Sequence, residues 1–250
     1  MASAGKIRVD IKLVEMGLVA SLERARAMIL AGRVLVAEQK VDKAGTRIDC
    51  NAPLRLLGEE LQYVSRGGLK LAEALKRWPI PVQGRSCLDI GASTGGFTDC
   101  LLQHGAVRVT AVDTGFGQIA MKLRIDPRVR LFERTNARLL LPSALVDRTQ
   151  SPLTLLVMDV SFISVALVLP PVLAAAPDLT EAVILIKPQF EAEREHVGKG
   201  GIVRDPAVHQ LAVDKVVDCV QSLFWRVVEV IPSPITGVEG NHEFLLYAKK

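Results

Sequence analysis

The stretch CLDIGASTGGFTDCLLQHGAVRVTAVD, from Cys87 to Asp113, decides the fold of the larger part of this chain. It predicts an apolar strand, a glycine-rich turn, a helix over Thr98 to Gln103 and a second apolar strand. Glycines in such a turn let the backbone approach a ligand, and the free amides at the helix start point at it. Asp113 ends the second strand, where a carboxylate accepts both hydroxyls of a ribose. The stretch therefore indicates a nucleotide-cofactor pocket.

The turn reads GASTGG, with Ser93 where a dinucleotide-binding fingerprint has its second glycine. That glycine gives clearance for a pyrophosphate, so we expect S-adenosylmethionine, which has no phosphate, rather than NAD. The alternative is an ordinary strand-to-helix turn, with Asp113 as a solubilising charge. For one of the candidates, Phe97, a core position is favoured over a cofactor contact. The candidate cofactor contacts in and after the turn are Gly91, Ala92, Ser93, Gly95, Gly96, Phe97 and Asp113.

Composition sets the class of protein. A chain of 250 residues with 49% hydrophobic content can bury a sizeable core, as one large domain or as a small and a medium one. The four cysteines lie far apart, with no CxxC and no histidine in ligand spacing, so we expect neither disulfides nor a metal site. No apolar leader or spanning stretch stands out. We expect a cytoplasmic protein without integral membrane association, and a monomer by default.

The positive charge is concentrated at the front of the chain. The net charge is +4, yet residues 1–78 hold 14 Lys or Arg against 9 Asp or Glu, whereas residues 79–250 hold 17 against 18. Affinity for nucleic acid depends largely on neutralising phosphates, so the asymmetry indicates an N-terminal surface for RNA or DNA. On charge alone, a solvated basic face explains it equally well.

The first fifty residues predict a small α+β unit. Gly17 and Gly32 would end two helices, and Ser21 would cap the second. The expected elements are helices over Ile7 to Met16 and Leu22 to Leu30, then strands over Arg33 to Gln39 and Thr46 to Asp49. Candidate contacts to RNA phosphates on this unit are Arg8, Lys12, Arg24, Arg26 and Arg33.

Residues 6–50 resemble the small RNA-binding domain named after small-subunit ribosomal protein S-four, through RVDIKLVEMGL, AGRVLV and VDKAGTRI. The sequence departs from that pattern at Leu22, where an arginine is common, and at Ala37 to Gln39, which replace an asparagine-glycine turn. We expect this domain over residues 1–60. An extended linker with a hinge follows over residues 61–68, and its Arg66 is a further candidate for RNA contact.

Residues 69–250 begin with a helix to Arg77 and then alternate apolar strands with helical stretches, which is typical of an α/β fold with a parallel sheet. Seven strands match a class I (Rossmann-like) methyltransferase, whose last pair forms an antiparallel edge. The expected strands are Ser86 to Ile90, Val107 to Asp113, Val129 to Glu133, Thr154 to Asp159, Ala182 to Lys187, Arg226 to Ile231 and Glu243 to Ala248.

Charged residues stand at the ends of three of these strands. Asp159 and Lys187 close theirs, and Glu243 opens the last. Each alone is equally well explained as a charge that meets water. With Lys70 in the entry helix they form a K-D-K-E set that resembles the FtsJ-like ribose 2′-O-methyltransferases. After the third strand, Asn136 is a candidate adenine contact or, alternatively, a helix cap.

The chemistry of a ribose 2′-hydroxyl explains these residue types. The hydroxyl is a weak acid, so its attack on a sulfonium methyl needs its proton removed, and Lys187 is the candidate base. A second ammonium at Lys70 and partial burial favour the neutral amine. Asp159 and Glu243 would orient the two ammonium groups. Lys70 has an alternative role in holding a phosphate beside the target nucleotide.

The order of motifs along the whole chain, SRGGLKL, GASTGGFT, MDVSFIS, IKPQFE and GNHEFLL after an S-four-like domain, resembles the TlyA family. The resemblance implies S-adenosylmethionine-dependent 2′-O-methylation of cytidine in ribosomal RNA, with ribosomal RNA or ribosomal subunits as partners. Members of this family also carry the name hemolysin, so a membrane-lytic protein is one alternative. An RNA-binding protein without catalysis is another.

Overall fold

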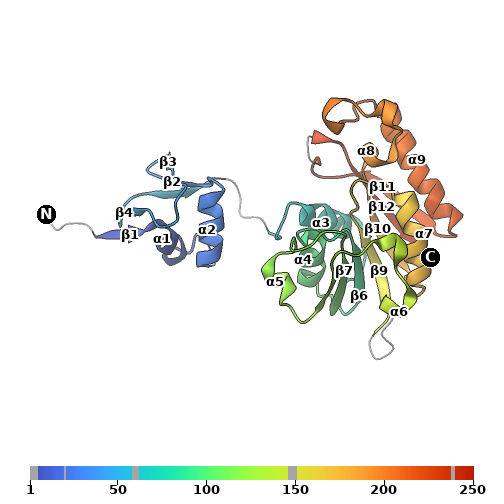
Figure 1. Ribbon diagram of the computed structural model, residues 1–250, viewed down its shortest axis with the longest axis horizontal. Helices are drawn as coiled ribbons and strands as arrows, with labels where there is room; N and C mark the ends of the chain where they lie inside the picture. The colour runs from blue at the N-terminus through green and yellow to red at the C-terminus, as the bar shows by residue number, and fades with distance from the viewer. Residues whose placement is uncertain (1–4, 20, 58–61, 146–150, 238–239) are drawn as a thin grey trace. The chain divides into compact units, whose positions relative to one another are not determined.

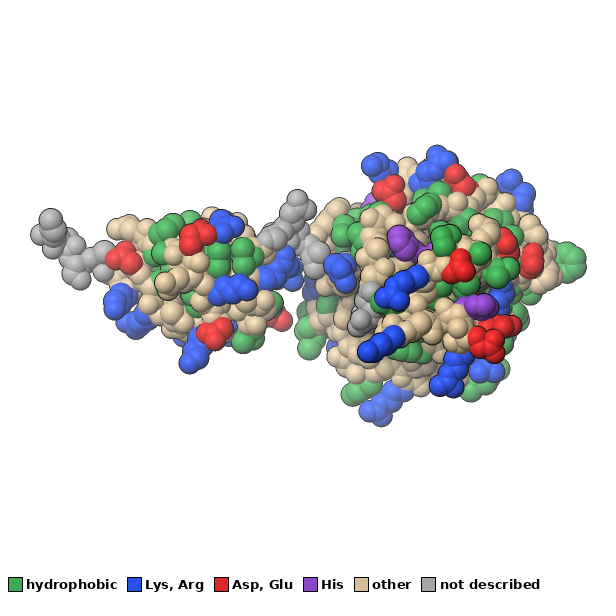
Figure 2. Space-filling view, turned by 90° about the horizontal axis from the view of Figure 1, so that it is seen from above, with side chains coloured by type: hydrophobic (Ala, Val, Ile, Leu, Met, Phe, Trp, Pro, Cys, Tyr) green, Lys and Arg blue, Asp and Glu red, His purple; other side chains and the backbone are tan. Residues whose placement is uncertain are grey.

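The computed structural model describes residues 5–19, 21–57, 62–145, 151–237 and 240–250. The chain divides into two compact units, residues 1–60 and residues 61–250 (Figure 1). Each unit has its own hydrophobic core, so each is described by itself. Figure 2 shows Lys and Arg side chains on the visible face of both units, interspersed with Asp and Glu.

The first unit packs two helices on two small sheets. One sheet pairs β1 with β4, and the other has the order β3-β2-β5. Its core comes from the inner faces of both helices, with Val9, Leu13, Ala25 and Ile29 wholly buried. The elements are β1 Lys6–Arg8, α1 Val9–Glu15, α2 Leu22–Leu30, β2 Val34–Val36, β3 Gln39–Lys40, β4 Arg47–Asp49 and β5 Leu54–Leu56.

Both predicted helices are present, and Ser21 caps the second by accepting a hydrogen bond from the amide of Arg24 at 3.2 Å. The first helix begins at Val9 rather than at Ile7, because Ile7 and Arg8 belong to β1. Three strands, β1, β3 and β5, were not predicted, since strands of two or three residues rarely carry enough alternation to be recognised from sequence. The strand predicted up to Gln39 ends at Val36. Ala37 and Glu38 have positive φ values of 47° and 64°, so they form the tight turn that asparagine and glycine usually form.

The second unit is a seven-stranded sheet in the order β11-β12-β10-β9-β6-β7-β8. Neighbouring strands from β10 to β8 are parallel, and β12 lies between β10 and β11, antiparallel to both. The predicted class I methyltransferase sheet is confirmed, including its antiparallel edge. The strands are β6 Ser86–Ile90, β7 Arg108–Val112, β8 Val129–Phe132, β9 Leu153–Met158, β10 Glu181–Ile186, β11 Arg226–Pro232 and β12 Phe244–Lys249.

Helices cover both faces of this sheet (Figure 1). On one face α3, α4 and α5 bury residues such as Leu71, Leu101 and Leu123, and on the other α7 and α9 bury residues such as Leu169 and Val216. The helices are α3 Gly67–Arg77, α4 Gly96–Gln103, α5 Met121–Arg124, α6 Pro142–Leu145, α7 Val165–Ala175, α8 Pro188–Glu191 and α9 Pro206–Ser222. Short 3-10 turns cover Ala137–Leu139, Arg194–His196 and Lys199–Gly201.

The segment before α3 packs inside the second unit, in contrast to the extended linker and hinge expected over residues 61–68. Tyr63 is 2% exposed, and the amide of Val64 donates to Asp99 Oδ2 at 2.8 Å. Helix α3 begins at Gly67 rather than at Leu69. A Cβ on Gly68 would overlap the Tyr63 side chain, so only glycine fits there. The start of the helix that carries Lys70 is therefore held in place.

Candidate active site

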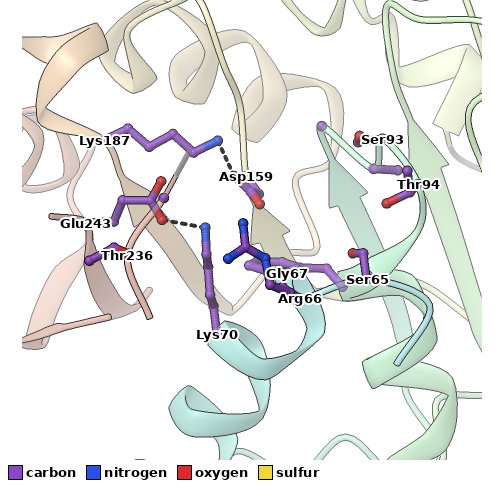
Figure 3. A pocket seen from close by; sticks show the side chains of 15 residues that line it. Ser65, Arg66, Gly67, Lys70, Ser93, Thr94, Asp159, Lys187, Thr236 and Glu243 are labelled. Atoms are coloured by element: carbon purple, nitrogen blue, oxygen red, sulfur yellow. Dashed lines mark hydrogen bonds and ion pairs between the residues drawn. The ribbon is translucent and has the colours of Figure 1, made fainter. Parts of the chain in front are cut away.

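The four K-D-K-E residues line one pocket of about 250 Å³ in the second unit (Figure 3). Lys70 comes from the first turn of α3, Asp159 directly follows β9, Lys187 directly follows β10, and Glu243 directly precedes β12. Parallel strands end at one edge of the sheet, and this is where open α/β sheets bind ligands. The topology therefore brings together residues that are as far apart in sequence as Lys70 and Glu243.

The four side chains form two ion pairs. Lys187 Nζ lies 2.6 Å from Asp159 Oδ1 and donates a hydrogen bond to Ser161 Oγ at 2.7 Å. Lys70 Nζ donates to Glu243 Oε2, and both residues are buried. A buried charge is tolerated when it is paired. Each ammonium is thus held at the pocket by a carboxylate of its own. Ser161 was not among the predicted site residues, although its place two residues after Asp159 is a usable signal.

A larger cavity of about 520 Å³ adjoins this pocket, within the size range of small-molecule sites. Both cavities are lined by Gly91, Ser93 and Asp159. Asp113 and Asn136 line the larger cavity, together with apolar residues that suit an adenine ring: Val112, Ile163 and Val168. One further lining residue missed by sequence is Phe162, which is 91% exposed and has a φ of +64°.

The carboxylate of Asp113 holds the turn in place. Its Oδ2 accepts a hydrogen bond from the amide of Ser93 at 2.7 Å, and its Oδ1 accepts one from the amide of Gly115 at 2.6 Å. Each carboxylate oxygen has a further lone pair, so the group has capacity for two more hydrogen-bond donors. A carboxylate with free lone pairs and an apolar wall in one cavity suit the ribose and the adenine of S-adenosylmethionine.

The glycines of the turn serve protein packing as well as ligand approach. A Cβ on Gly91 would lie 2.5 Å from the backbone oxygen of Asp159. On Gly95, which has a φ of +95°, it would overlap Leu123. On Gly96 it would overlap Ser65. Gly95 lines neither the larger cavity nor the pocket of the lysines, so its position does not support its prediction as a cofactor contact, and packing explains this glycine instead.

The other candidates of the turn face the smaller pocket. Ala92, Gly96 and Phe97 line the pocket that holds the lysines rather than the larger cavity. Phe97 is only 3% exposed and belongs to the core between the sheet and α3, which is the alternative favoured for it. Asn136 caps a 3-10 turn, since its Oδ1 accepts a hydrogen bond from the amide of Arg138 at 3.0 Å. It also lines the larger cavity, and its contact with adenine stays a prediction.

One buried carboxyl beneath the turn escaped the sequence analysis. Asp89, inside β6, is 0% exposed, and its Oδ2 accepts a hydrogen bond from Thr98 Oγ1 at 2.6 Å. Burial raises the pKa of Asp89 to about 7, against the lowering effect of the Thr98 hydrogen bond. The nearby charge of Asp159 raises this pKa further. A signal was available, since Asp89 is the one charged residue in the apolar run from Cys87 to Ile90.

The candidate RNA-binding residues of the first unit differ in how exposed they are and in whether they are already paired. Lys12 is 8% exposed and its ammonium donates to the backbone oxygen of Cys50, so its prediction as a phosphate contact is wrong. Arg8 and Arg26 both pair with Asp10, at 2.7 and 3.4 Å, and their side chains stay 43% and 56% exposed.

The other two candidates on this unit also differ from each other. Arg33 donates to the backbone oxygen of Leu57 at 2.9 Å. Arg24 is half-buried, and no acid pairs with it among the residues that the structure describes. Arg66, in the second unit, is exposed and lines the pocket of the lysines.

The described residues contain neither a membrane-spanning helix nor a cluster of metal ligands. No described helix is both long and apolar enough to cross a membrane. No group of three or more His, Cys, Asp or Glu side chains, within the same part of the chain, is arranged to hold a metal ion.

Comparison with known proteins agrees with this architecture. Residues 63–250 match the FtsJ-like methyltransferase family and residues 5–51 match the S4 domain. The chain is 47% identical to YqxC of Bacillus subtilis over 242 residues, 97% of this chain and 85% of that protein. It is 44% identical over 247 residues to the 16S/23S rRNA (cytidine-2′-O)-methyltransferase TlyA of Mycobacterium tuberculosis, covering 98% of this chain and 91% of that protein.

A solved structure of a hemolysin-named protein from Streptococcus thermophilus is similar over nearly the whole chain. It superposes with a TM-score of 0.73 at 42% identity, covering 99% of this chain and 90% of that one. The family match spans most of the chain, and the near full-length relatives exceed 40% identity. The chain therefore belongs to the TlyA family of FtsJ-like, S-adenosylmethionine-dependent methyltransferases that carry an S4 domain.

Proposed function

We propose that this protein transfers a methyl group from S-adenosylmethionine to the 2′-hydroxyl of a cytidine in ribosomal RNA. The observation that carries the proposal is the pair of lysine–carboxylate contacts facing one pocket, directly beside a cavity that suits the cofactor. Supporting it, the M. tuberculosis relative is named for this reaction on 16S and 23S rRNA. The partners we propose are ribosomal RNA or ribosomal subunits in the cytoplasm, met by a monomer.

In this proposal S-adenosylmethionine supplies an electrophilic methyl group on a sulfonium. The ribose oxygen would bond to that methyl as its bond to sulfur breaks, and the hydroxyl proton would pass to Lys187, which serves as base only as the neutral amine, after its own proton has left to solvent. Asp159 and Ser161 fix the position of Lys187 Nζ, at 2.6 and 2.7 Å. Aligned reacting groups contribute about 7–11 kcal/mol to lowering the barrier, so the fixed geometry matters as much as the proton acceptor.

Lys70 and Glu243 act on the other side of the pocket. Glu243 neutralises the buried ammonium of Lys70, which keeps two positive charges from facing each other unpaired. Lys70 and the exposed Arg66 both line the pocket, so they are positioned to hold the phosphate next to the target ribose. The S4 domain would supply affinity for structured RNA through Arg8, Arg24, Arg26 and Arg33, with Lys12 holding its fold.

The test is methyl transfer from labelled S-adenosylmethionine to purified ribosomal subunits and to free ribosomal RNA, followed by mapping of ribose methylation. Lys187→Ala should lower the rate constant by about 10²- to 10⁴-fold, the usual contribution of an acid–base group. Cofactor affinity should stay unchanged. Lys76→Ala is the matched control, since it removes an exposed lysine from the last turn of α3.

Undiminished transfer by Lys187→Ala would remove Lys187 as the base. Absence of transfer to any ribosomal RNA by the unaltered protein would refute the function itself. Deleting residues 1–60 should weaken RNA binding and flatten its salt dependence, while binding of S-adenosylmethionine persists.

A further inference from the structure

A third cavity, of about 300 Å³, continues the series formed by the first two. It shares Thr236 and Glu243 with the pocket of the lysines, just as that pocket shares other walls with the cofactor cavity. In Figure 3, Thr236 and Glu243 lie across the pocket from Ser93 and Thr94 of the glycine-rich turn. The pocket of the lysines therefore lies between the larger cavity, which we assign to the cofactor, and the third cavity.

The third cavity lies where β11 ends and β12 begins. Pro232 is the last residue of β11 and Phe244 the first of β12, and both line it. The start of α9 closes another side with Arg204, Pro206 and His209. Two of these elements are strands of the central sheet, and the residues between them, Ser233, Ile235, Thr236, His242 and Glu243, complete that side of the cavity.

The lining has the chemistry of a nucleotide site. Arg204 is exposed, and no acid pairs with it in the part of the chain that the structure describes. The exposed ring of His242 lies 5.6 Å from the ring of His209, which in turn meets the edge of Phe244 at 6.0 Å. His209 itself is fixed, because it is buried and its Nε2 donates to the backbone oxygen of Val203 at 2.8 Å.

We propose that this cavity binds the nucleotide adjacent to the methylated one, with its phosphate on Arg204 and its base against His242. The inference rests on the proposed function and adds to it the side from which RNA enters. An RNA chain has to continue past the reacting ribose, and the cofactor fills the opposite side. The volume is at the lower end for ligand sites, which suits a single nucleotide. Arginine and an exposed aromatic ring are the usual groups that hold unpaired nucleotides.

The experiment measures methyl transfer to ribosomal RNA as a function of RNA and salt concentration. Arg204→Ala should raise KM for RNA about tenfold, the effect of one lost charge-assisted hydrogen bond, with kcat and cofactor affinity unchanged. The slope of log affinity against log salt should fall by about 1, because one phosphate contact is gone. Arg204→Lys should restore the slope. His242→Ala should raise KM about fivefold or more through lost stacking, and His242→Phe should restore it.

Arg226→Ala is the matched control, since it removes an exposed arginine from the opposite end of β11. It should leave both KM and the salt slope at the values of the unaltered protein. If Arg204→Ala and His242→Ala also leave them there while the unaltered protein methylates RNA, the cavity binds no nucleotide and the inference fails alone. If the unaltered protein methylates no ribosomal RNA, the proposed function fails and the inference with it.

Discussion

Glu191 Oε1 accepts a hydrogen bond from the backbone amide of Val165 at 2.6 Å, so a residue at the end of α8 caps the first turn of α7. Glu191 Oε2 also accepts from Ser164 Oγ. The loop after β10, which carries Lys187, is thereby tied to the loop after β9, which carries Asp159. The two loops are joined at one end by the Lys187–Asp159 ion pair and at the other by Glu191.

We expect Glu191→Ala to lower kcat for methyl transfer about tenfold to hundredfold, since small displacements of aligned groups are costly. KM for S-adenosylmethionine should stay unchanged. Glu191→Gln keeps an oxygen for the amide of Val165 and should recover most of the loss. Steady-state kinetics give the separation of kcat from KM, and Glu193→Ala, an exposed neighbour, is the control. Equal loss in kcat for Glu191→Ala and Glu191→Gln would contradict the positioning role.

Asp113→Ala is expected to weaken binding of S-adenosylmethionine at least about tenfold, because hydrogen bonds to a charged group are lost. The same change frees the amides of Ser93 and Gly115, so circular dichroism should accompany the calorimetric titration. Asp178→Ala, which removes an exposed carboxylate elsewhere on the unit, should have no effect on affinity. Unchanged affinity in a folded Asp113→Ala protein would remove Asp113 from the cofactor site.

Two glycine substitutions separate backbone strain from crowding. Gly95→Ala and Gly117→Ala both place a Cβ on a residue with positive φ, 95° and 71°. Around Gly117 the Cβ meets nothing within 4 Å, whereas at Gly95 it overlaps Leu123. Urea unfolding should show a loss of about 1 kcal/mol for Gly117→Ala, and a further loss of about 1–3 kcal/mol for Gly95→Ala. Equal losses would show that crowding at Leu123 is relieved without cost.

The buried carboxyl of Asp89 should make stability depend on pH. Its pKa is about 7 in the folded chain, raised by burial, and about 4 in the unfolded chain. Folding therefore takes up a proton between these values, so this group lowers the free energy of unfolding as pH rises from about 4 to about 7. The effect levels off only once the pH is well above the folded pKa of about 7.

Asp89→Asn cannot lose a proton, and its side-chain oxygen still accepts from Thr98 Oγ1. The stability of the unaltered protein should therefore fall relative to Asp89→Asn across this pH window, without cofactor. Unfolding curves of both proteins at several pH values measure the difference, with Asp178→Asn as an exposed control. Parallel pH profiles for the unaltered protein and Asp89→Asn would show that Asp89 ionises normally.

The sheet was predictable because strands buried on both faces are short apolar runs, such as Leu153–Met158, set between helical stretches. The strand-end charges were predictable for the same reason, since a charged residue stands out beside such a run. The sequence did not predict which side chains pair with each other. Lys70 and Glu243 are 173 residues apart, and nothing local joins them. In the sequence Lys12 resembles any exposed basic residue of a helix, whereas in the fold it is buried and donates a hydrogen bond to the backbone oxygen of Cys50.

The close approach of Gly91 to Asp159 sets the spacing of the site. The amide of Asp159 donates to the backbone oxygen of Ile90 at 2.9 Å, and no Cβ fits between Gly91 and the Asp159 carbonyl. The glycine-rich turn after β6, beside the proposed site of the methyl donor, and Asp159 after β9, beside the proposed site of the ribose, are therefore neighbours on adjacent strands. Backbone contacts between β6 and β9 fix the distance between the turn and Asp159. Surface substitutions that change which RNA binds should therefore leave this distance unchanged.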